Sequence, residues 1–497
     1  MKKASVSLII RIAIIPVLLI AWGLDQTVSA KPKVEDGGAT SVTVNEIHPY
    51  QEFEDYTYVE ATVHGIVNRE DGTEGKYAVP IVLIYPNDGG NGVGVVDWLV
   101  TIGLQHGDFT ATADRWRPHH SALTVTDGYL FESGFTYAAV QWDKAVTDYF
   151  GPPAADQGEK PNHLIFGTIE EPEDAFDILL HTAGLLKYPD LLQTAFDIMP
   201  VDAVLSFGYS QSAGLQMEFM SRGVNLRNSE LAYDGHLLAK VGLLCLTFHN
   251  EPPGYYVPEA CNGVPVEDGT KVIHVAAQGD VEAVLYAGLS RFPDNPHWRQ
   301  YELAGVSHLP SPISPGLNEN QNPASSKPVF RAAFHNLARW VKDGVPAPPS
   351  RFIEGTLNTN GTFDTDLDED GNAIGGLRLP HMEQIIDGTL AGAPLGRYTG
   401  KHPEGNPDEL FWFGGYFEPF PPEEIAERYP DKETYVKRVT LAADYLLEGG
   451  YIHEEDRNAY VQEAKRTELF GTHPEPDHGF APGKKETGQR LIQGRKE

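Results

Sequence analysis

The fold of this chain is decided by the stretch Ser206-Phe207-Gly208-Tyr209-Ser210-Gln211-Ser212-Ala213-Gly214. An apolar run typical of a buried strand, 203–207, leads into it, and a segment with helical periodicity, 213–220, follows it. A serine at a sharp strand-to-helix turn needs small neighbours on both sides, because the helix packs close to the strand. Gly208 and Ser212 fill those two positions. The stretch therefore predicts a nucleophile elbow with Ser210 at its tip, and a serine in a structural turn is the alternative.

Strand-like runs continue on both sides of the elbow, and helix-like segments separate them. These short apolar runs are residues 135–140, 203–207, 241–246, 272–276 and 298–303. Helices are predicted at 173–186, which has Pro172 at its start, and at 329–343, which is closed by Gly344. Strands that alternate with helices form a mainly parallel sheet covered on both faces. Together with the elbow, this pattern predicts an α/β-hydrolase fold with a mostly parallel central sheet and helices on both faces.

The segment upstream of these runs has a different pattern. Three β-rich runs, at 56–59, 78–84 and 94–98, alternate with clusters of turn residues. They predict an antiparallel entry to the same sheet, which is therefore expected to be mixed.

Ser210 needs a base and the base needs an orienting carboxylate, because an alcohol is a poor nucleophile by itself. The fold fixes their order along the chain as serine, acid and histidine. Asp280 lies just past the end of the run 272–276, and Glu282 is the alternative acid. His308 lies in the loop after the next strand-like run, where the catalytic histidine is expected. Ser210, Asp280 and His308 are therefore the predicted catalytic residues.

Two backbone N–H groups are expected to stabilise an oxyanion in this fold. One belongs to Gln211, the residue after the nucleophile. The second is expected from the loop after the strand that ends at Trp98, near Leu99 or Val100, and Val100 is our choice. A main-chain donor leaves no mark in the sequence, so residue type does not identify it.

Two further carboxylates, Asp97 and Glu302, stand next to strand ends in the same part of the sequence. Both are interpreted as buried structural groups rather than as catalytic ones. His274, in the middle of a predicted strand, is likewise interpreted as a packing residue.

The first thirty residues have the features of a signal peptide. A basic start, an apolar run and a small-residue cleavage site stand at Lys2–Lys3, 12–22 and 28–30. The alternative is an uncleaved membrane anchor, but a spanning helix needs about 20 apolar residues. Arg11 and Asp25 bracket a shorter run. We therefore expect cleavage after Ala30, a secreted or periplasmic protein, and no stable membrane span afterwards.

The charge of the chain limits its partners. A formal net charge of −32 over 497 residues repels phosphate backbones, so nucleic acid is not expected as a partner. No cofactor or metal ion is predicted. The two cysteines, Cys245 and Cys261, either close one disulfide in an oxidising compartment or are a chance pair of buried thiols. Neither has the spacing of a metal site.

The character of the sequence changes beyond Pro349, to a segment rich in Gly and Asp, a polar helical stretch at about 433–465, and a charged tail. We expect a catalytic domain over 31–355 and an extension over 356–497 that packs on it. From about Thr472 the composition is one that need not fold.

One acidic stretch, Asp364 to Gly371, resembles a calcium loop because alternating carboxylates precede a glycine. Counted from Asp366, the twelfth position is Leu377 rather than the glutamate that such loops use. An acidic solvated turn is therefore preferred to a calcium site.

The combination of segments resembles the large family of secreted and periplasmic alpha/beta hydrolase domain proteins with a Gly-x-Ser-Gln-Ser elbow. The similar segments are 91–99, 208–212, 301–308, 339–344 and 370–380, so the resemblance spans roughly residues 55 to 465. It implies an esterase-like serine hydrolase, with Ser210 and His308 as nucleophile and base. Members of the family tend to carry a carboxylate where Gln278 stands, whereas Asp280 keeps its counterpart.

The residues and the resemblance together predict a carboxylic ester hydrolase that works through a Ser-His-Asp triad and an acyl-enzyme. Its substrate is expected to be a small-molecule or polymeric ester. Two alternatives stay open: a catalytically silent hydrolase fold used for binding, and a peptidase or amidase.

Overall fold

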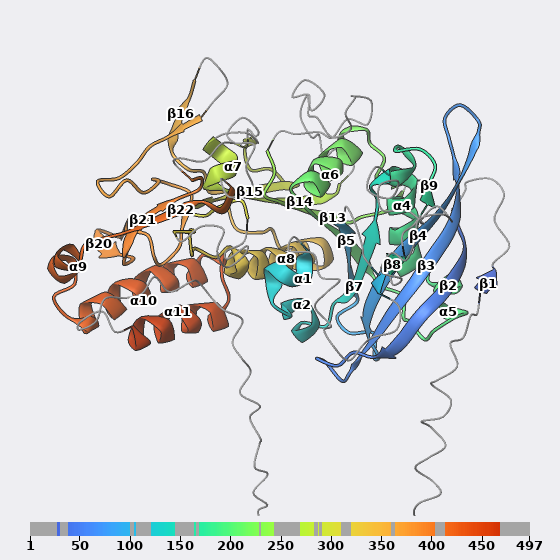
Figure 1. Ribbon diagram of the computed structural model, residues 1–497, viewed down its shortest axis with the longest axis horizontal. Helices are drawn as coiled ribbons and strands as arrows, with labels where there is room; N and C mark the ends of the chain where they lie inside the picture. Colours follow the sequence, from blue (N-terminus) through green and yellow to red (C-terminus); the bar gives the residue numbers. More distant parts are fainter. Residues whose placement is uncertain are drawn as a thin grey trace, which may run out of the picture. The chain divides into compact units, whose positions relative to one another are not determined.

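The computed structural model describes thirteen stretches of the chain (Figure 1), namely residues 27–29, 38–99, 104–105, 121–144, 164–165, 168–227, 230–242, 269–282, 287, 291–309, 320–358, 363–402 and 413–467. The chain divides into two compact units. Unit 1 comprises Met1–Val275, Leu289–Gln300 and Ala333–Ser350, and unit 2 comprises Ala276–Gly288, Tyr301–Ala332 and Arg351–Glu497. The expected boundary near residue 355 stays a prediction, and two segments that precede it, 276–288 and 301–332, group with the C-terminal residues in unit 2.

Unit 1 is built on one mixed sheet. The strands of this sheet that belong to unit 1 by most or all of their residues are, in spatial order, β1 (Thr27–Ser29), β2 (Gly38–Pro49), β3 (Tyr56–Asn68), β4 (Glu74–Pro86), β7 (Thr136–Gln141), β5 (Val93–Leu99), β10 (Ala203–Tyr209), β13 (Gly235–Ala239) and β14 (Lys271–Ala277), the last as far as Val275. The pairs from β1 to β7 are antiparallel, and those from β7 to β14 are parallel. The predicted parallel centre is confirmed, and so is the antiparallel entry for the runs 56–59 and 78–84, which lie in β3 and β4. The run 94–98 was wrongly assigned to that entry, because it forms β5, which pairs in parallel with β7 and β10. In Figure 1, β2, β3 and β4 form the long twisted ribbon at the N-terminal side of the sheet.

Several short elements complete unit 1. They are α1 (Ala122–Thr126), α2 (Tyr129–Glu132), α4 (Asp174–Lys187), α5 (Asp190–Gln193) and α6 (Gln211–Ser221), with the short strands β6 (Leu104–Gln105), β8 (Leu164–Ile165), β9 (Thr168–Ile169), β11 (Leu226–Arg227) and β12 (Glu230–Leu231). Helix α8 (Lys327–Asp343) belongs to unit 1 from Ala333 onward. Helices α4 and α8 confirm the two predicted helices to within two residues.

Helices cover both faces of the parallel part of the sheet, and β10 shows how. Successive side chains of a strand point to opposite faces. Ser206 accepts a hydrogen bond from Gln216 on α6, while the ring of Phe207 lies 5.5 Å from that of Phe334 on α8. Helices α6 and α8 therefore lie on opposite sides of the strand that leads to Ser210.

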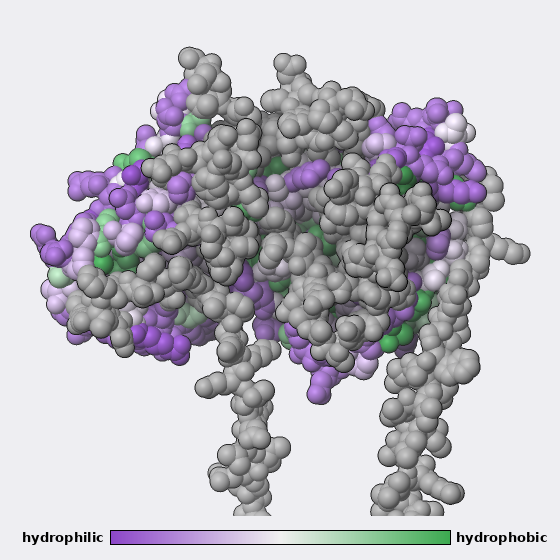
Figure 2. Space-filling model, viewed as in Figure 1, coloured by the Kyte–Doolittle hydropathy of each residue, from purple (hydrophilic) through white to green (hydrophobic). Residues whose placement is uncertain are grey.

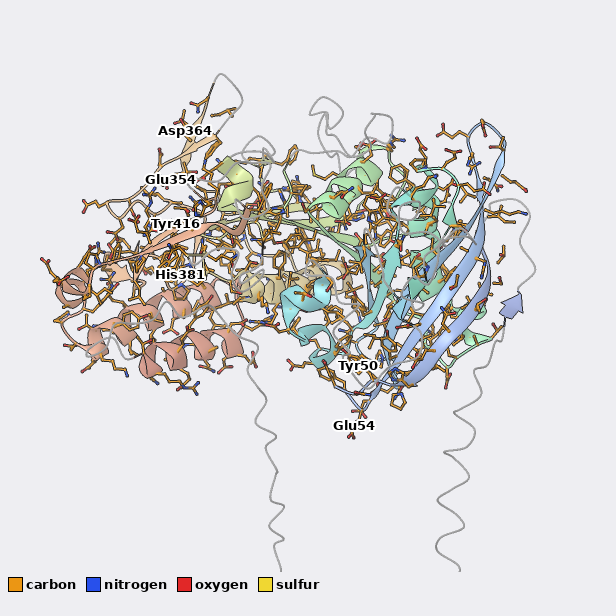
Figure 3. All side chains as sticks on the ribbon, viewed as in Figure 1. Tyr50, Glu54, Glu354, Asp364, His381 and Tyr416 are labelled. Carbon is orange, nitrogen blue, oxygen red and sulfur yellow. The ribbon has the colours of Figure 1, made fainter. Side chains whose placement is uncertain are left out.

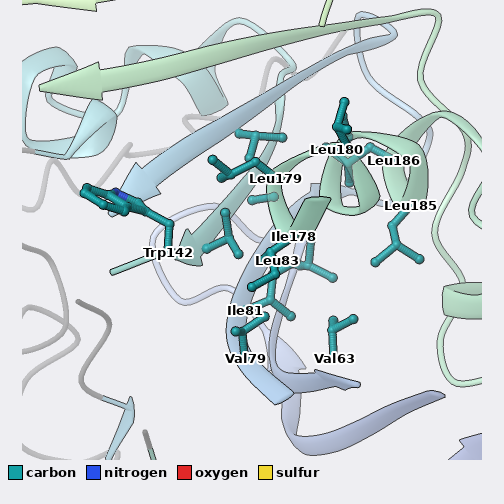
Figure 4. Packing of buried hydrophobic residues seen from close by; sticks show 14 of the residues in the cluster. Val63, Val79, Ile81, Leu83, Trp142, Ile178, Leu179, Leu180, Leu185 and Leu186 are labelled. Atoms are coloured by element: carbon teal, nitrogen blue, oxygen red, sulfur yellow. The ribbon is translucent and has the colours of Figure 1, made fainter. Parts of the chain in front are cut away.

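An apolar core of unit 1 lies between the sheet and α4 (Figure 4). Val63, Ile81 and Leu83 project from β3 and β4 toward Ile178 and Leu179 of the helix, and all five side chains are buried. Full burial of such a side chain contributes roughly 1.5–3 kcal/mol. This core fixes the antiparallel ribbon to the central strands.

Strand β13 lies at Gly235–Ala239 and not at the predicted 241–246, of which 243–246 fall outside the described residues. This strand was missed in the sequence because it begins with a glycine and carries His236, which break the apolar run. His236 is nevertheless fully buried, since its Nδ1 lies 2.5 Å from the hydroxyl of Ser206.

Unit 2 contains the remaining elements. They are α7 (Gln278–Glu282), the end of β15 (Trp298–Ala304), β16 (Gly355–Leu357), β17 (Phe363–Thr365), β18 (Leu377–Arg378), β19 (Gln384–Ile386), β20 (Thr389–Ala391), β21 (Gly396–Thr399), β22 (Tyr416–Pro419), α9 (Pro422–Arg428), α10 (Lys432–Glu448) and α11 (Glu454–Arg466). Strand β15 pairs with β18 in parallel, and β21 pairs with β22 antiparallel. Figure 3 places Asp364 on the β16–β17 hairpin and Tyr416 on β22.

The predicted polar helical stretch is confirmed as two helices, α10 and α11, separated by Gly449 and Gly450. Asp431 caps α10 by accepting the backbone N–H of Thr434 at 2.7 Å. The inner faces pack on a small apolar cluster that includes Tyr429 and Val439. Figure 2 shows hydrophilic residues along the outer edge of this helix pair.

The acidic stretch forms a turn in which two carboxylates, Asp368 and Asp370, have cationic partners. Asp368 accepts the backbone N–H groups of Asp370 and Asn372, at 3.0 and 2.9 Å, and forms an ion pair with Arg378. Asp370 receives a hydrogen bond from Nη1 of Arg428 at 2.8 Å. This arrangement favours a structural turn over a calcium loop. Within the described residues, no group of three or more His, Cys, Asp or Glu side chains is placed to hold a metal ion.

Several predicted features fall outside the described residues. These include Cys245, Cys261, the tail after Thr472, and most of the predicted signal peptide. Within that peptide, Thr27–Ser29 forms β1 and pairs with β2. In the part of the chain that the structure describes, no helix is long and apolar enough to cross a membrane.

Candidate active site

Ser210 occupies a sharp turn between β10 and α6. Its φ and ψ are 53° and −111°, a conformation that non-glycine residues rarely adopt. The turn is fixed by the backbone N–H of Ser210, which donates to the carbonyl oxygen of Ala239 on β13 at 2.8 Å. Gln211 begins α6, so its N–H is one of the free donors of a helix N-terminus. The structure thus gives the strand, turn and helix that the sequence predicted around Ser210.

The small residues of the elbow have specific contacts. A Cβ on Gly208 would lie 2.5 Å from Oε1 of Gln216 and 2.8 Å from the backbone nitrogen of Ala213, so any larger residue would push α6 away. Ser212 is buried, and its hydroxyl accepts the indole N–H of Trp142 at 2.9 Å. A glycine in its place would leave that buried donor without this acceptor. This contact gives a structural reason for a serine two positions after Ser210, where the common motif has glycine.

A buried polar bridge behind the elbow was missed by the sequence analysis. The hydroxyl of Ser206 lies 2.5 Å from Nδ1 of His236 and accepts Nε2 of Gln216 at 2.6 Å. All three side chains are fully buried. The bridge therefore ties β10 to β13 on one side and to α6 on the other. The available signal was a polar residue inside each of two mainly apolar strands, Ser206 in β10 and His236 in β13.

Asp280 and His308 form a hydrogen-bonded pair within unit 2. Oδ1 of Asp280 lies 2.6 Å from Nδ1 of His308, and Oδ2 accepts the backbone N–H of Ala277 at 2.6 Å. Asp280 is fully buried and His308 is 5% exposed. With Oδ2 occupied by Ala277, Oδ1 is the acceptor for an Nδ1–H of the imidazole. Such a pair fixes the orientation of the ring and leaves Nε2 as its basic nitrogen.

Glu282, the alternative acid, has different partners. Its Oε1 accepts Nε2 of Gln278 at 2.5 Å, and its Oε2 lies 3.4 Å from Nζ of Lys401. Oε1 of Gln278 in turn accepts the N–H of Gly305, in the loop that leads to the histidine, at 2.8 Å. Of the two candidate acids, Asp280 is the one that is hydrogen bonded to His308. Glu282 instead supports the loop through Gln278.

The predicted site residues do not all belong to one unit, and one of them lies outside the described residues. Ser210 lies in unit 1, whereas Asp280 and His308 lie in unit 2, so each half of the predicted triad is defined by its own contacts. Val100, the predicted second oxyanion donor, falls outside the described residues.

The two carboxylates interpreted as structural are fully buried and hydrogen bonded to backbone groups. Oδ2 of Asp97 accepts the N–H of Ala122 at 2.7 Å and the hydroxyl of Tyr137 at 2.8 Å. Oε2 of Glu302 accepts the N–H of Ile353 at 2.8 Å. Both act as links between neighbouring elements.

The buried carboxyl of Asp97 is expected to make the free energy of unfolding depend on pH. Burial raises the pKa of Asp97 to about 7, against the lowering effect of the bonds from Ala122 and Tyr137. An unfolded aspartate titrates near pH ~3.9. Between these two pH values, the carboxyl of Asp97 is ionised in the unfolded protein but keeps its proton in the native protein. The native state therefore binds more protons, and the free energy of unfolding falls as pH rises from about 4 to about 7. Asp97→Asn is expected to remove this share of the slope, roughly 4 kcal/mol over the interval.

Urea unfolding of both proteins at several pH values between 4.5 and 8 measures the difference. Burial also raises the pKa of Glu46, to about 7, so part of the slope is expected to persist in Asp97→Asn. If the free energies of unfolding of the wild type and Asp97→Asn differed by the same amount at every pH, the pH dependence would not come from Asp97.

A strained serine between a central parallel strand and a helix, with an acid and a histidine later in the chain in that order, defines the α/β-hydrolase class of protein. The chain belongs to the family described as Alpha/beta hydrolase domain, which it matches over residues 54–462. The predicted fold class and family are thereby confirmed. A comparison with curated proteins found no match.

Solved structures similar to this chain include three enzymes of low sequence identity. A glucuronoyl esterase from Solibacter usitatus is 10% identical, with a TM-score of 0.30 over 58% of this chain and 87% of that chain. Acetyl xylan esterase 1 from Thermoanaerobacterium sp. JW/SL YS485 is 13% identical, with a TM-score of 0.27 over 55% and 81%. A CE15 esterase from a marine bacterial metagenome is 11% identical, with a TM-score of 0.27 over 51% and 70%.

Proposed function

We propose that this protein is an exported serine hydrolase that cleaves carboxylic esters through Ser210, His308 and Asp280. The observation that carries the proposal is the strained backbone of Ser210, with its φ of 53° at the N-terminus of α6. A non-glycine residue is held in such a conformation only where its surroundings over-determine it, and this strain gathers at functional sites. The hydrogen bond between Asp280 and His308 supports the same reaction.

In the proposed cycle, Nε2 of His308 takes the proton of the Ser210 hydroxyl as its oxygen attacks the ester carbonyl carbon. Asp280 stabilises the imidazolium, and the N–H of Gln211, with a second donor near Val100, stabilises the oxyanion. The C–O bond to the alcohol then breaks, and the alcohol leaves with the proton from His308. Water attacks the acyl-enzyme by the same steps in reverse order, releasing the acid and restoring Ser210.

Export is part of the proposal because the first thirty residues have the parts of a signal peptide. The substrate is a small-molecule or polymeric ester outside the cytoplasm. A net charge of −32 supports a partner other than nucleic acid.

Covalent labelling with a fluorophosphonate probe tests the proposal, because the probe reacts with a serine only when a base activates it. We expect mass spectrometry of the wild-type protein to find the adduct on Ser210. Ser221→Ala, at the other end of α6, is a matched control that should label like the wild type. A wild-type protein that does not label would instead support the silent binding fold.

Matched ester and anilide substrates separate an esterase from an amidase or peptidase. We expect a kcat/KM for the ester at least 100-fold above that for the anilide with the same acyl group. Equal values for the two substrates would favour the peptidase or amidase alternative.

A further inference from the structure

Helix α7, which carries Asp280, and the loop that carries His308 are held by residues that follow them in the chain. All the contacts lie within unit 2, which groups residues 276–288 and 301–332 with the chain after Arg351. The segments that contact them are 399–401, which starts at the last residue of β21, and 413–415, which precedes β22.

On the acid side, α7 is fastened to the segment after β21. A Cβ on Gly279 would lie 2.4 Å from the carbonyl oxygen of Gly400, so the two backbones touch and neither position tolerates a side chain. Lys401 pairs with Glu282 at 3.4 Å. Asp280 therefore lies between Gly279 and Glu282, which both contact the segment 399–401.

On the histidine side, Asn322 joins the loop to β21. Its Nδ2 donates to the carbonyl oxygens of Gly305 and Thr399, each at 2.8 Å, and its Oδ1 accepts the N–H of Ala324 at 2.9 Å. The side chain is fully buried. Loss of a buried donor costs about 1–3 kcal/mol for each group left unsatisfied, so this joint is specific for asparagine.

Phe413 contacts the histidine itself. Its ring centroid lies 5.1 Å from that of His308, at an interplanar angle of 56°. Its carbonyl oxygen accepts the N–H of Leu309 at 3.0 Å. The backbone bond fixes the loop one residue past the histidine, while the ring limits rotation of the imidazole about its bond to the chain.

We propose that Phe413 and Asn322 are positioning residues of the catalytic centre. Segments 399–401 and 413–415 belong to that centre because they hold α7 and the loop that carries His308. Asp280 holds the Nδ1 end of the imidazole, and Phe413 packs against the ring. Together they set the direction in which Nε2 points. This inference rests on the proposed function, because it assigns the two residues to the base of that reaction.

The expected effect follows from geometry. A displacement of about 1 Å in a catalytic group can lower the rate roughly 100-fold without weakening substrate binding. Loss of a positioning residue is therefore expected to lower kcat and leave KM nearly unchanged.

The first test compares Phe413→Ala with Phe420→Ala. Phe420 is the same residue type, is also partly buried, and packs on Arg428 and the apolar cluster of unit 2 rather than on the histidine. We expect Phe413→Ala to lower kcat and the rate constant of fluorophosphonate labelling by 10- to 100-fold, with KM within about threefold of the wild-type value. Phe413→Tyr, which keeps the ring, should restore most of the activity, and Phe420→Ala should label within about twofold of the wild-type rate.

The second test compares Asn322→Asp with Asn225→Asp. Asn225 is an equally buried asparagine in unit 1, where it bonds Tyr233 and Thr270. Asparagine to aspartate keeps the shape and removes the donor, so the carboxylate at 322 would face two carbonyl oxygens. We expect Asn322→Asp to lower the labelling rate by at least 10-fold at a temperature where both variants are folded by circular dichroism, whereas Asn225→Asp lowers stability alone.

The outcomes separate this inference from the proposed function. Labelling of the wild type at Ser210, together with slow labelling of Phe413→Ala and Asn322→Asp, supports both. A wild type that labels while both variants label at the same rate overturns the inference and leaves the function standing. Equal losses in the control variants also overturn it, because the contacts would then serve stability only. A wild type that does not label overturns the function, and the inference with it.

Discussion

Replacing Ser210 by alanine is expected to lower kcat for ester hydrolysis by about 10⁶-fold. Alanine at this position keeps the backbone hydrogen bond to Ala239, and it has the same preference as serine against a positive φ. The variant should therefore fold like the wild type while lacking the oxygen that forms the acyl-enzyme. The remaining activity should come from binding and the oxyanion donors alone. Steady-state hydrolysis of an activated aryl ester measures the loss.

The control for this prediction is the unfolding temperature, which should agree with that of the wild type. Residual activity should be insensitive to the fluorophosphonate probe, since the probe has no serine to modify. A variant that keeps kcat within tenfold of the wild-type value would show that another residue is the nucleophile.

The elbow was predictable because its signal is local. Strand, small residues, serine and helix follow each other within about a dozen positions, and each has its own sequence pattern. Strands β7, β10 and β14 were predictable for a similar reason, because a strand buried on both faces is a continuous apolar run. Strand β13 broke that rule with His236, whose hydrogen bond to Ser206 only the fold brings about.

Asp280 is the predicted acid, but Glu282 stays an alternative in the sequence because the two residues are two positions apart and both follow the same strand. Spacing along the chain does not tell which carboxylate a distant loop approaches. The contacts differ: Asp280 meets His308, and Glu282 meets Gln278 and Lys401. Catalysis by Asp280 stays a proposal, and the contacts define how to test it.

The support of the histidine could not be predicted at all. Phe413 contacts His308 from far along the chain, and Asn322 joins Gly305 to Thr399, which lies 77 positions from it. An isolated phenylalanine or asparagine has no sequence pattern that indicates such a role. The extension after residue 355 was expected only to pack on the hydrolase. Its contacts with α7 and with the loop that carries His308 are the reason to propose that it is part of the catalytic centre.

Asp280→Asn is expected to lower kcat by about 10⁴-fold. The reason lies in the second partner of the side chain. The N–H of Ala277 needs an acceptor, so the amide would turn its oxygen to Ala277 and its nitrogen to His308. An amide N–H facing Nδ1 requires that nitrogen to be unprotonated, which moves the proton of the neutral imidazole to Nε2. Nε2 would then have no lone pair with which to take the proton of Ser210.

The matched variant is Glu282→Gln, which also replaces a carboxylate by an amide two positions away. It removes the charge facing Lys401, and its oxygen still accepts from Gln278, so the loss of kcat should be tenfold or less. Because a 10⁴-fold loss corresponds to about 5.4 kcal/mol of transition-state stabilisation, the two outcomes are far apart. If Glu282→Gln proved the more damaging change, Glu282 would be the acid, and the bond between Asp280 and His308 would have to be structural.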